Sequence, residues 1–397
     1  MQSKNFRTTL ILSALVAFAP MSIDMYLPAL PALERYFATD TASVQHTLAA
    51  FFLGLTAGQL LYGPLADRYG RKPPLYFGLT LYVAASAACA LAPNIGSLVA
   101  LRFLQAVSGC AGMVVARAVV RDLYDHQESA RVFSILLMVM GIAPIVAPLA
   151  GGFLLAWLGW RSIFWVLALF GMACLAAVKL RLPETIPAGL PRVPLSHALR
   201  NYAGLLADRR YLGYALSGGF GQAGMFAYIS GSPFVIIDLY GVPAQHYGWI
   251  FGLNATGIVA FTQWNRKLLR RHDADRLLDA GNLAGVAACA LLVLGAATDA
   301  LGLAGILVPL FFVVSMRGLT FPNASAGAMA PFPEKAGSAS ALLGAVQFAI
   351  AAMASVTVGW LHDGTAVPMA AVVGTCGFLA FVSYRILVPA AAREGRS

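Results

Sequence analysis

Residues 8–31 read TTLILSALVAFAPMSIDMYLPALP. As a helix this run is long enough to cross about 30 Å of hydrocarbon, and Asp24 is its one residue of the Asp, Glu, Lys and Arg types. A charge at the centre of a membrane helix costs at least about 2.5–3.5 kcal/mol, so an acid placed there indicates a function. We predict that Asp24 carries a proton. The alternative is an aspartate that caps a broken helix or tethers a neighbouring one.

The composition of the whole chain excludes an ordinary soluble domain, because 59% of the residues are hydrophobic and 11% are charged. Apolar runs of spanning length recur at 8–30, 44–65, 74–92, 97–118, 131–155, 160–180, 211–232, 246–264, 277–297, 301–321, 338–360 and 367–389. The sequence therefore predicts an all-α polytopic membrane protein with twelve transmembrane helices. The polar segment 181–209 divides it into two six-helix bundles, 1–180 and 210–397, joined by a cytoplasmic linker with a short amphipathic piece.

The net charge of +10 is a topology signal rather than a nucleic-acid-binding patch. With the N-terminus in the cytoplasm, about 23 of the 27 Lys and Arg residues fall on the cytoplasmic side. Arg35 and Arg161 fall outside, and Arg102 and Arg317 fall within spans. This bias places both termini in the cytoplasm.

The loop before the third span, residues 63–72, reads GPLADRYGRK. Gly63 lets two helices approach closely, and Gly70 permits a tight reversal of the chain. Asp67 is expected to accept hydrogen bonds from a neighbouring helix N-terminus, and Arg68 and Arg71 belong to the same charged turn. We interpret the loop as a latch that holds one conformation closed on the cytoplasmic side. The alternative is a plain basic loop that only sets the topology.

This loop resembles the signature loop of the major facilitator superfamily. Residues 22–31, SIDMYLPALP, resemble the first helix of its bicyclomycin- and chloramphenicol-resistance branch of drug:proton antiporters. Residues 101–106, LRFLQA, resemble the family's motif on the fourth span, and residues 147–152, APLAGG, resemble the fifth-span motif typical of antiporters. The resemblance covers essentially the whole chain and implies two bundles in which spans 1 and 4 pack side by side.

Arg102 lies in the outer half of the fourth span, at a depth compatible with a direct or a water-bridged ion pair to Asp24 if spans 1 and 4 pack side by side. Its fixed positive charge favours the ionised acid while burial disfavours it, and such a balance suits a proton carrier. The alternative is an arginine that extends to the outer headgroups. Gln105 lies on the same face as Arg102 and is either a cavity hydrogen-bonder or a helix–helix contact.

Two further groups of residues have predicted roles. Span 5 is a candidate hinge, since prolines bend a helix and small residues allow close contact; its residues are Pro144, Pro148, Gly151 and Gly152. A kink with no switching role is the alternative. Aromatic and amide side chains are candidates for a substrate cavity, because they stack on or orient an apolar drug; they are Tyr26, Gln105, Phe226, Tyr228, Asn254, Asn323 and Gln347.

Sites for other functions are not found in the sequence. It has no Gly-rich phosphate loop, no zinc-type spacing and no arguable Ser/His/Asp set, so we expect no ATP, metal, cofactor or enzymatic reaction. The five cysteines fall within apolar spans and are expected to be buried and unpaired.

Together with this resemblance, the sequence predicts a transporter of the bacterial inner membrane whose partners are small molecules, protons and membrane lipid. We expect a monomer that exchanges small apolar compounds, of the bicyclomycin or chloramphenicol type, for protons. The alternatives are an exporter of a metabolite or an amino acid with the same fold, and a membrane sensor that transports nothing.

Overall fold

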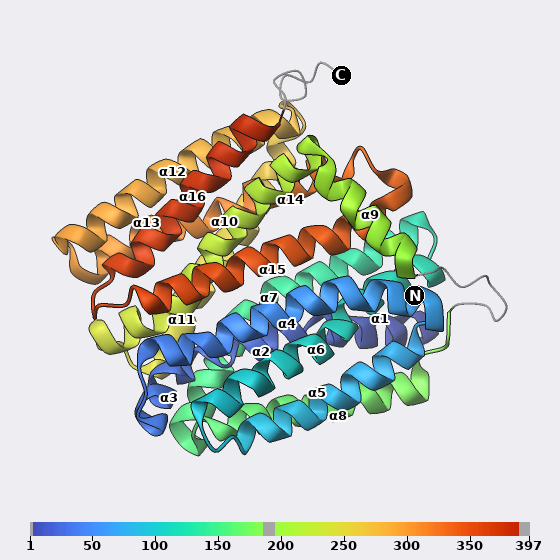
Figure 1. The fold of residues 1–397 in the computed structure, drawn as a ribbon, viewed down its shortest axis with the longest axis horizontal. Coiled ribbons are helices and arrows are strands. Elements are labelled where there is room, and N and C mark those ends of the chain that lie inside the picture. The colour runs from blue at the N-terminus through green and yellow to red at the C-terminus, as the bar shows by residue number, and fades with distance from the viewer. Residues whose placement is uncertain (1–2, 186–194, 389–397) are drawn as a thin grey trace.

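The computed structural model describes residues 3–185 and 195–388, and the regular elements within them are all helices. Figure 1 shows two neighbouring groups, one from the first part of the chain and one from the second. The first group comprises α1 (Ser3–Val16), α2 (Phe18–Asp24), η1 (Leu27–Ala29), α3 (Leu30–Phe37), α4 (Thr41–Tyr69), α5 (Lys72–Ala90), α6 (Ile95–Leu123), α7 (His126–Leu158) and α8 (Arg161–Arg181).

The second group follows helix α9 (Leu195–Ala207), which forms where the amphipathic piece of the linker was expected. Residues 186–194 of that linker lie outside the described residues. The group comprises α10 (Arg209–Pro233), η2 (Phe234–Leu239), α11 (Ala244–Leu268), α12 (Ala274–Thr298), α13 (Gly302–Ser315), α14 (Arg317–Met329), η3 (Pro333–Lys335), α15 (Ala336–Trp360) and α16 (Val367–Leu387). We call the two groups the first and the second half.

The helices of both halves have the length that a bilayer requires. Eleven helical segments of the described chain are long and apolar enough to cross a membrane. The expected span at 246–264 is α11, which is less apolar but has 25 residues and so extends over about 37 Å. The predicted twelve-helix, multi-pass architecture is therefore present.

Short polar residues begin several of these helices. The side chains of Asp40, Asn94, Asp125 and Asp208 each accept a hydrogen bond from a backbone N–H in the first turn that follows. Such caps satisfy amide groups that have no partner inside the helix. Most of the sparse polar residues at span ends thus have a local structural role, which sets Asp24 apart.

The two halves contact each other through glycines. A Cβ atom on Gly359 of α15 would stand 3.0 Å from the Cα of Ala42 on α4, and one on Gly344 would stand 3.1 Å from the side chain of Gln59. Across the other side, a Cβ on Gly152 of α7 would stand 2.8 Å from the carbonyl oxygen of Ala244. These close approaches pack α4 on α15 and α7 on α11. The five cysteines are buried with free thiols, as predicted.

Candidate functional site

Asp24 is the last residue of α2, and its side chain is buried. The helix stops there because Pro28 has no N–H to donate to the Asp24 carbonyl oxygen. The carboxyl group lies near Tyr228 on α10 and Tyr247 on α11, two buried tyrosines of the second half. Asp24 therefore lies in the buried interior where the two halves meet.

Arg102 does not form the expected ion pair with Asp24. Its guanidinium is fully buried, donates from Nη1 to Oε1 of Gln105 at 2.6 Å and from Nη2 to the carbonyl oxygen of Ser22 at 3.0 Å. The burial also excludes an arginine that extends to the headgroups. The bond to Ser22 ties α6 to the backbone two residues before Asp24, so Arg102 holds the helix that presents the acid.

Aromatic rings surround this cation. The Arg102 guanidinium carbon lies 4.2 Å from the ring centre of Phe51 and 4.5 Å from that of Tyr26. The hydroxyl of Tyr26 is hydrogen-bonded to Thr47 at 2.9 Å. Cation–π contacts of this kind gain strength when water is excluded, and they help to hold a charge that has no carboxylate partner in the described chain. Tyr26 thus belongs to the surroundings of Arg102.

Other predicted cavity residues are bonded within their own half. Gln105 accepts from Arg102 and donates to Ser86 at 2.8 Å, which matches the helix–helix alternative. Asn254 donates to the hydroxyl of Tyr228 at 3.0 Å, and so helps to position a tyrosine that faces Asp24. Asn323 exchanges hydrogen bonds of 2.9 and 3.3 Å with Asn265.

Phe226 and Gln347 lie close to the junction of the halves. The ring of Phe226 packs against Phe52 of the first half at 4.5 Å and against Phe348 at 5.7 Å between centres. Gln347 is buried, and no protein acceptor reaches its Nε2 within the described residues. The Phe226 cluster, Phe52, Phe226 and Phe348, thus fills the space between α4, α10 and α15 with aromatic surface.

The 63–72 loop forms an ionic cluster around Arg71. The Arg71 guanidinium donates from Nη1 to Asp67 at 2.6 Å and from Nε and Nη2 to Asp122 on α6 at 2.8 and 3.3 Å. Burial disfavours the charged guanidinium, but its hydrogen bonds to Asp122 and Asp67 outweigh this effect and raise the pKa of Arg71. Gly70 has a φ of +93°, which confirms the predicted tight reversal. Arg68 lies over the ring of its neighbour Tyr69 at 5.4 Å.

Two expectations about this loop are wrong. Asp67 does not cap the next helix; Glu184 does, by accepting from the backbone N–H of Arg71 at 2.8 Å and of Lys72 at 3.0 Å. This cap could not be predicted from the sequence, because Glu184 is 113 and 112 residues away from the two amides that it caps. Gly63 is not a point of close helix contact either, since a Cβ there would meet no atom within 4 Å.

Gly63 instead lines a cavity of about 520 Å³ between the halves, at the end of the bundle that carries Asp67. The wall of this cavity includes four charged residues, Asp67, Arg71, Arg117 and Lys335. The cavity is therefore more charged than the apolar substrate cavity expected from the sequence. None of the seven predicted cavity residues lines it. They lie deeper, within or between the bundles.

At the opposite end of the bundle, a contact that the sequence did not reveal joins the halves beside a second cavity of about 440 Å³. Arg35 of α3 donates to Asp238 of η2 at 3.1 Å, and so links the first half to the second. Nearby, the close approach of Gly151 on α7 to the backbone of Met25 seals the space beside Asp24. Pro144 and Pro148 lie within a continuous helix α7, and their role as a hinge stays a prediction.

Comparison with known proteins identifies the family. A sequence model described as "Major Facilitator Superfamily" matches residues 12–356. The chain belongs to the major facilitator superfamily. It is 36% identical, over 95% of both chains, to an uncharacterised superfamily transporter, YdgK, of Bacillus subtilis. It is 31% identical to a bicyclomycin resistance protein homolog of Haemophilus influenzae, over 97% of both chains.

Further similarities agree with this assignment. A chloramphenicol resistance protein of Pseudomonas aeruginosa is 31% identical over 86% of this chain and 83% of its own length. These relatives place the chain in the bicyclomycin- and chloramphenicol-resistance branch. The xylose transporter XylE of E. coli, in a partially occluded inward-open conformation, has the same fold, with a TM-score of 0.76 at 14% identity over 98% of both chains. The protein is therefore a multi-pass membrane transporter of this superfamily.

Proposed function

We propose that this transporter exports small, largely apolar drugs across the bacterial inner membrane in exchange for protons. The observation that carries the proposal is the position of Asp24, a buried acid at the junction of the two halves. A carboxyl group there changes its surroundings whenever the halves move relative to each other. Because protonation follows the access of water and the nearby dipoles, the acid can load a proton from one side and release it to the other.

The proposed cycle begins with the mouth open on the outside, where Asp24 takes a proton and the drug leaves. The halves then rock, Asp24 releases its proton into the cytoplasm, and a new drug enters. With the termini in the cytoplasm, the 520 Å³ cavity faces the cytoplasm and the Arg35–Asp238 contact is the closed outer end. One proton crossing about 100 mV releases about 2.3 kcal/mol, enough for roughly a fifty-fold gradient of a neutral drug.

The Phe226 cluster is the drug-binding surface that we propose. Three rings from both halves offer apolar area without directional hydrogen bonds, and such contacts discriminate weakly between substrates. Relatives named for resistance to bicyclomycin and to chloramphenicol support this class of cargo. With one membrane-embedded acid at the junction, we expect one proton for each drug.

The decisive experiment measures drug transport in membrane vesicles with an imposed pH gradient. Asp24→Asn should fold normally but lose the gradient-driven transport. The matched control is Asp363→Asn, which removes an exposed acid that accepts from Thr365 in the loop after α15. Full transport by Asp24→Asn would refute the mechanism. If the unmodified protein transports amino acids but no drug, it is a metabolite exporter. If it transports nothing and releases no proton when drug is added, it is a sensor.

A further inference from the structure

Arg317 is a second buried arginine, and the proton-coupling site does not use it. It is the first residue of α14 and the sixteenth of the membrane span Gly302–Met329, so it lies near the middle of the membrane. The sequence suggested the last turn of a span ending at residue 321, but the helix continues to Met329. Its side chain is 8% exposed. It points into the interior of the second half, among α10, α12, α14 and α16, and away from the 520 Å³ cavity.

The charge of Arg317 has no acidic partner in the described chain. Nη2 donates to the carbonyl oxygen of Gly218 at 3.2 Å, whereas no protein acceptor reaches Nε. The two acids of α12 are bonded elsewhere, Asp279 to Arg385 and Asp275 to two tyrosine hydroxyls. A guanidinium stays charged in a protein, and a buried charge without a partner costs several kcal/mol. The site therefore calls for a negative charge.

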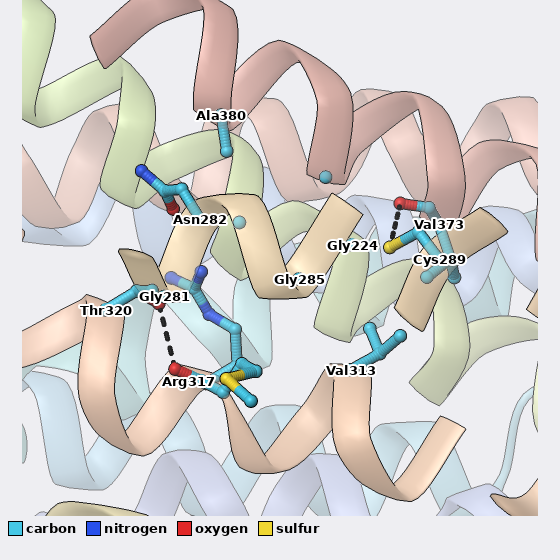
Figure 2. A pocket seen from close by; sticks show the side chains of 13 residues that line it. Gly224, Gly281, Asn282, Gly285, Cys289, Val313, Arg317, Thr320, Val373 and Ala380 are labelled. Atoms are coloured by element: carbon cyan, nitrogen blue, oxygen red, sulfur yellow. Dashed lines mark hydrogen bonds between the residues drawn. The ribbon is translucent and has the colours of Figure 1, made fainter. Parts of the chain in front are cut away.

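A small cavity lies against this guanidinium, as Figure 2 shows, with Asn282 on the neighbouring helix α12. Its volume is about 30 Å³, room for roughly two water molecules or one halide-sized ion, and too little for a phosphate or a drug. Glycines provide the space, because a Cβ on Gly221 would overlap the Arg317 guanidinium. The amide nitrogen of Asn282 donates to Ser217 at 3.1 Å and points away from the Arg317 guanidinium, while the amide oxygen points toward it (Figure 2).

We propose that this Arg317 cavity is a binding site for a small monovalent anion, chloride in the cell. The donors are the N–H groups of Arg317 at Nε and Nη1, which have no acceptor among the described residues. The ion neutralises the buried guanidinium and stabilises the packing of α10, α12, α14 and α16. This function is structural and independent of drug and proton exchange, since the cavity does not open onto the residues around Asp24.

The test uses the purified full chain in detergent and measures its melting temperature as chloride replaces gluconate at constant ionic strength. The melting temperature should rise by a few degrees and saturate by about 0.15 M chloride. Arg317→Gln should abolish the rise. Arg266→Gln, which removes an exposed arginine at the end of α11 in the same half, should leave it intact.

A second measurement keeps the proposal testable if Arg317→Gln does not fold. Crystals of the unmodified protein soaked in bromide should show an anomalous-scattering peak within hydrogen-bonding distance of Arg317. A melting temperature that does not respond to chloride, a response that persists in Arg317→Gln, or a bromide-soaked crystal without that peak would each overturn the anion site.

Discussion

Gly151 on α7 is the position at which one added methyl group should disturb the junction beside Asp24 most. A Cβ there would stand 2.7 Å from the carbonyl carbon of Met25 and closer still to its oxygen. Ordinary van der Waals contact begins at 3.4 Å, so Gly151→Ala requires a separation of at least 0.7 Å between α7 and Met25. Both partners are backbone, and no side-chain rotation can relieve the overlap. The substitution therefore pushes the two segments apart.

The magnitude follows from the cost of overpacking, which is about 1–3 kcal/mol. Alanine also favours a helix over glycine by about 0.5–1 kcal/mol, but this gain is the same whether the Arg35 end is closed or open. The substitution therefore changes the free-energy difference between the closed and the open conformation by the full overpacking cost. It shifts the equilibrium about 5- to 150-fold toward the conformation in which the Arg35 end is open.

The shift can be measured with spin labels on cysteines introduced at Thr39 and Leu239, one in each half near the Arg35 end. The five native cysteines are buried, so the introduced ones react selectively. In Gly151→Ala the distance distribution should gain a longer population, and drug export should fall. The matched control is Gly141→Ala on the same helix, where a Cβ would lie 3.7 Å from Val259, an ordinary contact. Identical distributions in the two variants would refute the reasoning.

Three other predictions concern single contacts. Asp122→Ala should slow transport more than Asp67→Ala, with the drug profile unchanged in both, because Arg71 donates twice to the more buried Asp122 and once to Asp67. Initial transport rates over a drug panel test this order, and equal effects would contradict it. Arg102→Lys should cut transport at least about tenfold at normal expression, since an ammonium cannot make the forked contacts to Gln105 and Ser22. Wild-type rates in that variant would show that charge alone suffices. Asp40→Ala should lower the stability by about 0.5–2 kcal/mol at neutral pH, through loss of the α4 cap. The hydrogen bonds from Ser43 lower the pKa of Asp40 in the folded protein. The stability that the Asp40 carboxylate contributes is therefore fully present above its unfolded-state pKa of about 3.9. It is lost as the pH falls through the lower pKa of the folded state. The melting temperature of the unmodified protein should therefore exceed that of Asp40→Ala at neutral pH, and the two should become equal at acidic pH.

Features that depend on neighbours in the chain could be predicted from the sequence. Apolar runs of spanning length predict membrane helices because an unpaired backbone amide cannot face hydrocarbon. Pro28 predicts the break after Asp24 because it removes the donor that the helix needs, and Gly70 predicts a turn because it tolerates a positive φ. The same local reasoning identified Asp24 as the exceptional acid of the first span.

The partners of the charged residues required the tertiary structure. Arg102 bonds to the backbone at Ser22 rather than to Asp24, and Glu184 rather than Asp67 caps α5. The sequence shows which residues are charged and how deep in the membrane each one lies. Which hydrogen bonds they form depends on which helix faces meet and on how each helix is rotated about its axis. Those are set by packing between segments that can be more than a hundred residues apart in the chain. The same reason applies to Arg317. The sequence places it near the end of the predicted span 301–321, whereas in the structure it lies buried beside a cavity in the centre of the second half.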